Sequence, residues 1–144
     1  MSTQSNKVSA RTIAEQGFQR GNLDALNEIV ASDYVEHFPV PPGWPAGLAG
    51  LKAFITLTRN AFSDFQYTIE DMIAEDDKVV LRCRATGTQT GSFLMLPPTG
   101  KQATWTEIHI GRFVDGKLVE HWANQDQLGM LQQLGAVPPN GVAQ

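Results

Sequence analysis

Residues 102–126, QATWTEIHIGRFVDGKLVEHWANQD, contain two stretches of alternating residues separated by Asp115-Gly116. An Asp-Gly pair between two such stretches is the strongest short-range signal for a β-hairpin with a two-residue turn. The turn fixes which residues lie opposite one another along the whole hairpin. The sequence therefore predicts two long antiparallel strands, 102–114 and 117–126.

The expected pairing brings an unusual mixture of side chains to one face of this hairpin. Phe113 lies opposite Leu118 near the turn, where the face is apolar. Unpaired buried charges are costly, whereas polar groups that converge among aromatic rings are typical of a small-molecule pocket. His121 falls on the opposite face, which we expect at the surface or at a subunit interface. Unless a β-bulge shifts the register, the pocket face further along holds Trp105, Glu107, His109, Trp122, Asn124 and Asp126.

The rest of the chain places helices before strands, an order that favours an α+β fold. Apolar residues at helical spacing predict helices over 8–20 and 47–62, a second helix that starts at Asn22 and carries Leu23, Leu26, Ile29 and Val30, and a short closing helix after Asp126. The Pro-rich segment 39–45 predicts a long loop that contains Trp44. Alternating residues predict further strands near 65–69 and 79–86.

Composition limits the functional classes. The 144 residues suit a single domain, 1–144, for which we expect flexible ends at about 1–7 and 137–144. Eleven Lys and Arg against fifteen Asp and Glu give a net charge of −4, without the basic stripe that nucleic-acid binding needs. No apolar run is long enough to span a bilayer or resembles a leader, and one cysteine, Cys83, cannot form an internal disulfide. We therefore expect a soluble cytoplasmic protein.

No pattern in the sequence indicates a cofactor or a metal. The three histidines lack the close spacing of metal ligands, and no G-x-S-x-G nucleophile motif is present. Cys83 is expected as a small core residue, and Arg82 and Arg84 alternate with apolar residues as in a half-solvated strand. We expect a small hydrophobic or aromatic molecule as the partner, with neither nucleic acid nor membrane.

Four short strings, taken in order, resemble the SnoaL-like polyketide cyclases over about residues 8–135. The resemblance implies a cone-shaped α+β barrel, the architecture of ketosteroid isomerase, scytalone dehydratase and nuclear transport factor 2. There, a curved mixed or antiparallel sheet wraps around helices and encloses a deep pocket, and two or four copies commonly pair through the outer sheet face. The strings are GTQTG at 87–91, PPTGK at 97–101, RFVDGK at 112–117 and EHW at 120–122, and YVEH at 34–37 fits the family's first strand.

The resemblance also implies a reaction. Well-known members close the last ring of aromatic polyketides by an intramolecular aldol condensation without a cofactor. Asp126 matches the family's acid/base aspartate, and His109 matches a pocket histidine. Many relatives carry His where this chain has Gln89, which cannot shuttle a proton near neutral pH.

These residues suit acid/base chemistry on a small cyclic keto compound. Asp126 is the expected base and then acid, with its pKa raised by Trp105 and Trp122. His109 is expected to hold a carbonyl or relay a proton, and Asn124 to donate to an oxyanion. The expected substrate contacts are Trp105, Glu107, Trp122, Asn124, His37 and Phe93, with Met95 and Trp44 as further candidates.

Several of these residues also suit a purely structural role. Asp126 precedes a short helix and is equally suited to cap it. His37 suits a tie between the first strand and a loop, and Glu107 suits an ion pair at a rim. The function also has alternatives: an epoxide or ester hydrolase, in which Glu107 positions water beside Asp126, or a non-enzymatic module that binds an apolar ligand, with Asp126 turned into the helix cap.

Overall fold

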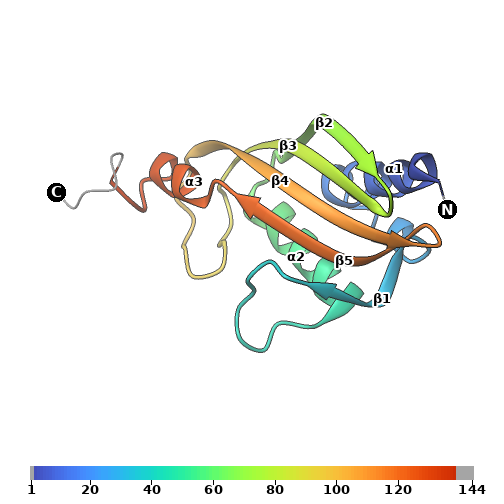
Figure 1. Ribbon diagram of the computed structural model, residues 1–144. Helices are drawn as coiled ribbons and strands as arrows, with labels where there is room; N and C mark the ends of the chain where they lie inside the picture. Colours follow the sequence, from blue (N-terminus) through green and yellow to red (C-terminus); the bar gives the residue numbers. More distant parts are fainter. Residues whose placement is uncertain (1, 139–144) are drawn as a thin grey trace.

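The computed structural model describes residues 2–138. Helices lie against one face of a curved sheet, and a short helix follows its last strand (Figure 1). The elements are α1 (Thr3–Thr12), the π-helix η1 (Ile13–Gln19), the 3-10 helix η2 (Leu23–Leu26), β1 (Val30–Glu36), α2 (Gly47–Ala61), β2 (Gln66–Glu75), β3 (Lys78–Thr88), β4 (Gln102–Val114), β5 (Lys117–Gln125) and α3 (Gln127–Gln133).

The sheet has five strands in the order β1-β5-β4-β3-β2. β1 runs parallel to β5, and the other neighbours are antiparallel. The sheet is curved but does not close, and its concave side faces α1 and α2 (Figure 1). This arrangement confirms the expected α+β class, and it leaves space between the sheet and the helices for a site.

The N-terminal helices differ from the prediction. The first helix begins at Thr3 rather than at residue 8, so residues 3–7 belong to it, and it widens into a π-helix from Ile13. The next helix is a single 3-10 turn that Asn22 does not cap through its side chain, and Val30 already starts β1. β-Branched residues such as Ile29 and Val30 favour strands over helices, which explains the short turn. The expected flexibility of 139–144 lies outside the described residues.

The core packs aromatic rings between α2 and the sheet. Phe62 is fully buried, with ring centroids 5.8 Å from Phe93 and 5.0 Å from Trp105. Burying a side chain of this size contributes about 1.5–3 kcal/mol. Cys83 is buried as predicted, and Arg82 and Arg84 pair with acidic residues on the exposed side of the sheet, as a half-solvated strand requires.

The β4–β5 hairpin has the predicted turn and an additional bulge. Val114 pairs with Lys117 and Phe113 with Leu118, as expected, but Arg112 then pairs with Glu120. An extra residue, Val119, therefore lies in β5 without a partner, which is the definition of a β-bulge.

The bulge reverses the predicted faces of the far half of β5. His109 pairs with Ala123 rather than with Trp122, and Glu107 pairs with Gln125. Because side chains alternate along a strand, a shift of one residue exchanges inward and outward positions. The predicted register is therefore wrong beyond the bulge, although the positions on β4 keep their expected face.

Candidate functional site

A cavity of about 490 Å³ lies between the concave face of the sheet and the helices. Its volume falls within the range that holds small organic ligands. The predicted Pro-rich loop contributes Val40, Trp44 and Pro45 to the lining, most of which is apolar. No helix in residues 2–138 is both long and apolar enough to cross a membrane. The titratable residues that line the cavity are Asp33, Tyr34, Glu36, Tyr67, His109 and His121.

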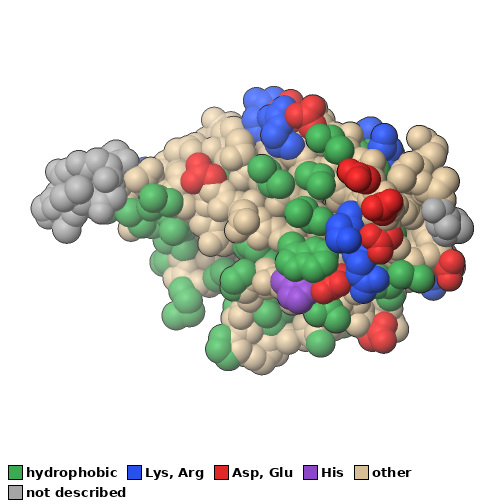
Figure 2. Space-filling view, viewed as in Figure 1, with side chains coloured by type: hydrophobic (Ala, Val, Ile, Leu, Met, Phe, Trp, Pro, Cys, Tyr) green, Lys and Arg blue, Asp and Glu red, His purple; other side chains and the backbone are tan. Residues whose placement is uncertain are grey.

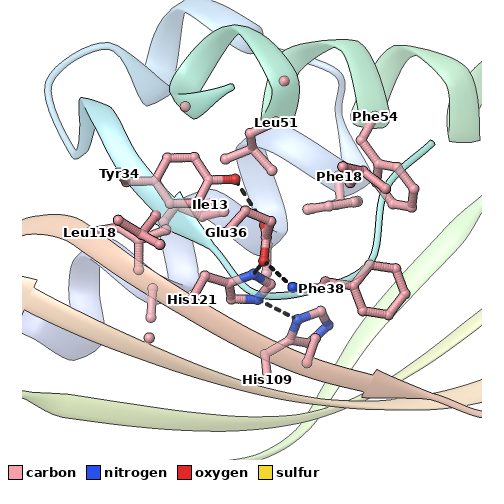
Figure 3. Close-up of a pocket in the computed structure, with 18 of the residues that line it drawn as sticks. Ile13, Phe18, Tyr34, Glu36, Phe38, Leu51, Phe54, His109, Leu118 and His121 are labelled. Atoms are coloured by element: carbon pink, nitrogen blue, oxygen red, sulfur yellow. Dashed lines mark hydrogen bonds and ion pairs between the residues drawn. The ribbon is translucent and has the colours of Figure 1, made fainter. Parts of the chain in front are cut away.

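Two histidines meet on the floor of this cavity (Figure 3). Nδ1 of His109 lies 2.9 Å from Nε2 of His121, and the two rings stack with centroids 5.1 Å apart. Nδ1 of His121 lies 2.6 Å from Oε2 of Glu36. Tyr34 donates its hydroxyl hydrogen to Oε1 of the same carboxylate at 2.9 Å, and the backbone N–H of Phe38 donates to Oε2 at 3.1 Å. Glu36 thus fixes the ring of His121 from β1.

A second carboxylate holds His109 from the other side. Nε2 of His109 lies 2.8 Å from Oε1 of Glu107, and the Tyr67 hydroxyl donates to the same oxygen at 2.8 Å. Trp105 donates from Nε1 to Oε2 at 2.7 Å. The side chains form one continuous chain, Glu36–His121–His109–Glu107, which we call the four-residue relay.

Burial and hydrogen bonding act in opposite directions on the two carboxylates. Burial alone raises the pKa of Glu107, but hydrogen bonds from His109, Tyr67 and Trp105, and the charge of His109, outweigh it and lower the pKa. The balance is the same at Glu36: burial raises its pKa, but contacts with His121, Phe38 and Tyr34 outweigh burial and lower the pKa. Both groups are therefore carboxylates at neutral pH.

The two tyrosines are hydrogen-bond donors in this site. Burial raises the pKa of Tyr67 well above its usual value, and Glu107 raises it further. Burial and Glu36 act in the same way on Tyr34, whose pKa also rises. Each phenol stays protonated and gives its hydrogen to a carboxylate.

Asp126 lies outside the cavity. Its carboxylate accepts the backbone N–H of Gly129 at 2.9 Å and caps α3, and the residue is exposed. Asp126 does not contribute to the cavity lining. The prediction that it faces the pocket is wrong, because the bulge turns this end of β5, and the alternative of a helix cap is confirmed.

Three other predicted contacts also face away from the cavity. Trp122 stacks on His37 with centroids 4.9 Å apart, and Nε2 of His37 lies 2.7 Å from Oε2 of Glu120. Asn124 is exposed. The predicted pocket positions of Trp122 and Asn124 are wrong because of the bulge, and His37 contacts strand β5 rather than the loop of the alternative interpretation. His121, expected on the outer face, is instead a cavity residue.

The remaining candidates are divided between the cavity and the core. Trp44 lines the cavity, and His109 lies there as expected. Trp105, Glu107 and Phe93 line a much smaller space beside it. Glu107 is buried against His109, so the alternative of an ion pair at a rim is wrong. Met95 is 96% exposed and takes no part.

Gln89 has a structural role away from the cavity. Its side chain is fully buried, its amide nitrogen donates to the carbonyls of Leu96 and Pro97, and its oxygen accepts from Thr99. It fixes the loop between β3 and β4. A glutamine there makes these contacts without any need for a titrating group.

Four site residues could not be assigned to the pocket from the hairpin pattern: His121, Glu36, Tyr34 and Tyr67. Tyr67 follows the alternation of 65–69, and Tyr34 and Glu36 share one face of β1 because they are two residues apart. This alternation could have assigned Tyr67, Tyr34 and Glu36 to the cavity from the sequence. The signal for His121 was hidden, since it depends on the bulge.

Comparisons with known proteins agree with this architecture. Residues 8–134 match the family described as SnoaL-like polyketide cyclase. The chain is 31% identical over 142 residues to the aklanonic acid methyl ester cyclase DnrD of Streptomyces peucetius, which covers 94% of this chain and 92% of the relative. It is 26% identical over 120 residues to the nogalonic acid methyl ester cyclase of Streptomyces nogalater, covering 82% and 89%.

A solved structure shows the same fold. TsrD from Streptomyces laurentii superposes with a TM-score of 0.86 at 26% identity, covering 95% of this chain and 99% of that one. The family match extends over most of the chain and includes every residue of the four-residue relay. The protein belongs to the SnoaL-like polyketide cyclase family.

Proposed function

We propose that this protein closes a ring in a small keto ester by an intramolecular aldol condensation, with His121 as the base and His109 as the hydrogen-bond donor. The observation that carries the proposal is the contact between the two imidazoles in a mostly apolar cavity. The relatives named as methyl ester cyclases support the choice of substrate class.

The contact between the two rings is the place where a substrate carbonyl fits. Nδ1 of His121 and Nε2 of His109 are each held by a carboxylate, so only the two facing nitrogens are available to a ligand. Opening that contact exposes one N–H donor and one lone pair side by side. A carbonyl with an adjacent C–H bond needs both groups at once.

Glu36 decides which ring supplies the lone pair. A carboxylate beside Nδ1 keeps the hydrogen on that atom, so Nε2 of His121 is the acceptor. The same logic orients the histidine of a Ser-His-Asp triad. His109 then donates a hydrogen bond from Nδ1 to the oxygen on which negative charge develops.

The reaction balances without any other reagent. Nε2 of His121 takes the α-proton, and the resulting enolate oxygen accepts the hydrogen bond from His109. The enolate carbon attacks a second carbonyl of the same molecule, and a C–C bond forms. The new alkoxide takes the proton back from Nε2 of His121, which restores the enzyme.

In this proposal the base is His121, whereas the sequence and the family resemblance favoured Asp126. Asp126 is engaged in the α3 cap, a position that also fits the non-enzymatic alternative. The relay distinguishes the two, because a module for apolar ligands has no use for paired imidazoles and carboxylates. A hydrolase requires a carboxylate that can hold water, but both oxygens of Glu107 already accept hydrogen bonds from the protein.

Ring closure of aklanonic acid methyl ester, the compound in the name of one relative, tests the proposal. An aldol product has the mass of the substrate and a different retention time in liquid chromatography with mass detection. A product heavier by one water indicates the hydrolase. Binding without conversion of this ester or of nogalonic acid methyl ester indicates the module, and either result overturns the proposal.

We further infer that a second copy of the chain covers the outer face of the sheet. Apolar side chains lie between charged ones on the face turned away from the helices (Figure 2). Val35, Ile73 and Ile108 of this sheet are 52%, 65% and 49% exposed. An apolar surface rimmed by charges is typical of an interface. A homodimer or homotetramer and a cytoplasmic location remain predictions.

A further inference from the structure

Glu107 is surrounded by three hydrogen-bond donors at the buried end of the four-residue relay. Its side chain is 5% exposed, and it contacts Trp105, Tyr67 and His109. No Lys or Arg in residues 2–138 lines the main cavity. A buried carboxylate needs a compensating charge, and His109 is the ring in direct contact with it.

The protons of the relay can be counted from its contacts. The chain contains three contacts in series: Glu107 to His109, His109 to His121, and His121 to Glu36. The Tyr67 hydroxyl also lies 2.8 Å from Nε2 of His109, but its hydrogen is donated to Oε1 of Glu107. Ionised carboxylates supply no hydrogen, so each of the three contacts needs one from an imidazole ring. Three hydrogens on two imidazole rings make one of the rings an imidazolium.

Burial assigns that charge to His109. Its partner Glu107 is 5% exposed, whereas Glu36, the partner of His121, is 21% exposed. Attraction between charges is stronger where water is excluded. The same hydrogen arrangement leaves Nε2 of His121 as the acceptor in the contact between the rings, as the proposed reaction requires.

The other groups that face His109 do not supply a competing charge. Tyr67 on β2 and Cys83 on β3 are both near Glu107, and burial raises the pKa of each, to about 11 for Cys83. Both stay neutral at pH 7. From β5 and β1, His121 and Glu36 form their own pair.

We propose that Glu107 is a positioning residue: fixed by Trp105 and Tyr67, it keeps His109 protonated on both ring nitrogens and thereby makes Nδ1–H a permanent donor to the substrate oxygen. This inference rests on the proposed function, because it names what prepares the donor of that reaction. Glu107 acts through His109 and does not touch the reacting atoms.

Ring ¹⁵N spectra of the wild-type protein at pH 7 give the first test. The resonances of His109 are assigned by their absence in His109→Gln. We expect both nitrogens of His109 at protonated positions and Nε2 of His121 at an unprotonated one. A neutral His109 in the wild-type spectrum overturns the proposal, whatever the variants do.

Glu107→Gln removes the charge while it keeps the shape. We expect Nδ1 or Nε2 of His109 to lose its hydrogen at the same pH. With aklanonic acid methyl ester as the probe, we expect kcat to fall on the order of 10²-fold while KM is unchanged, as for the loss of one oxyanion donor. An unchanged spectrum of His109 in the folded variant contradicts the proposal, whatever the activity of the variant.

The matched control is Glu120→Gln. Glu120 also contacts a histidine, His37, at 2.7 Å, but on the outer face of the sheet. We expect the spectrum of His109 and kcat to stay at wild-type values. The spectra distinguish failure of this inference from failure of the proposed function. If His109 is neutral but turnover still requires His121, only the proposed role of Glu107 is wrong. A charged His109 in a protein that converts neither ester leaves that role intact and removes the proposed function.

Discussion

Nδ1 of His109 and Nε2 of His121 lie 2.9 Å apart, and this one contact joins a carboxylate on β1 to a carboxylate on β4. His109 faces the cavity in the expected hairpin pairing, whereas His121 reaches it only because β5 is bulged. The pair gives an apolar cavity its acid and its base, so changes to it should alter chemistry more than binding or folding.

Replacing His121 should remove turnover. We expect His121→Gln to lower kcat for aklanonic acid methyl ester by about 10²–10⁴-fold, since the base is lost. His37→Gln is the control, because His37 lies on the outer face. Steady-state kinetics and a thermal melt of both variants check the expectation. A rate equal to wild type in His121→Gln would falsify the assignment of the base.

Replacing Asp126 should change stability and leave the reaction intact. Asp126→Ala loses the cap on α3 and should lower the free energy of unfolding by about 1 kcal/mol. Asp126→Asn keeps an acceptor and should stay within a few tenths of a kcal/mol of wild type. Urea denaturation measures both. If Asp126→Asn folds normally but converts no ester, the aspartate has the catalytic role that the family resemblance implies.

The acid side of the stability profile should depend on Glu36. Its pKa is lowered in the folded protein, so it stabilises the fold above the unfolded value of 4.5, and this contribution is lost as the pH falls through the folded value. We expect Glu36→Gln to be less stable than wild type at pH 7 and to lose less stability below about pH 4.5.

Urea midpoints measured across this range check the sign of the effect. Glu15→Gln is the control, because it removes an exposed carboxylate from a surface pair with Arg11. Parallel profiles for Glu36→Gln and wild type would show that Glu36 does not contribute to the acid transition.

A charge on the outer sheet face should separate the copies. We expect Ile108→Lys to sediment as a monomer where the wild type forms a dimer or tetramer, because a lysine cannot be buried there without a partner. Val8→Lys is the control on α1, where Val8 is 57% exposed. A wild-type protein that sediments as a monomer contradicts the proposed assembly.

Local signals in the sequence were sufficient for most of the fold. The turn at Asp115-Gly116 gives β4 and β5 their predicted starting pairs, and helix α2 follows the apolar spacing of 47–62 within one residue. These elements depend on neighbours in the chain. The N-terminal segment was less predictable, because the π-helix and the short 3-10 turn are set by packing rather than by spacing.

The site was predicted only on β4. His109 and Glu107 face inward on the strand whose pairing is continuous with β3. Nothing in the sequence around Val119 distinguishes a bulged residue from a paired one, so the face of β5 was inverted. The contribution of β1 was equally hidden, because its parallel pairing with β5 joins residues far apart in the sequence.

The bulge at Val119 occupies a single residue, so deletion of one codon there would leave Glu120 opposite Arg112 and all later pairs unchanged. Loss of the bulge with Val119 retained and paired with Arg112 would instead move the remainder of β5 to the opposite side of the sheet. Trp122 and Asn124 would then enter the cavity, and His121 would leave it. The pairing of one residue, Val119, therefore decides which side chains of β5 reach the cavity without any amino-acid substitution. The reactive contents of this pocket therefore depend partly on how the strands pair, which residue identities alone do not reveal.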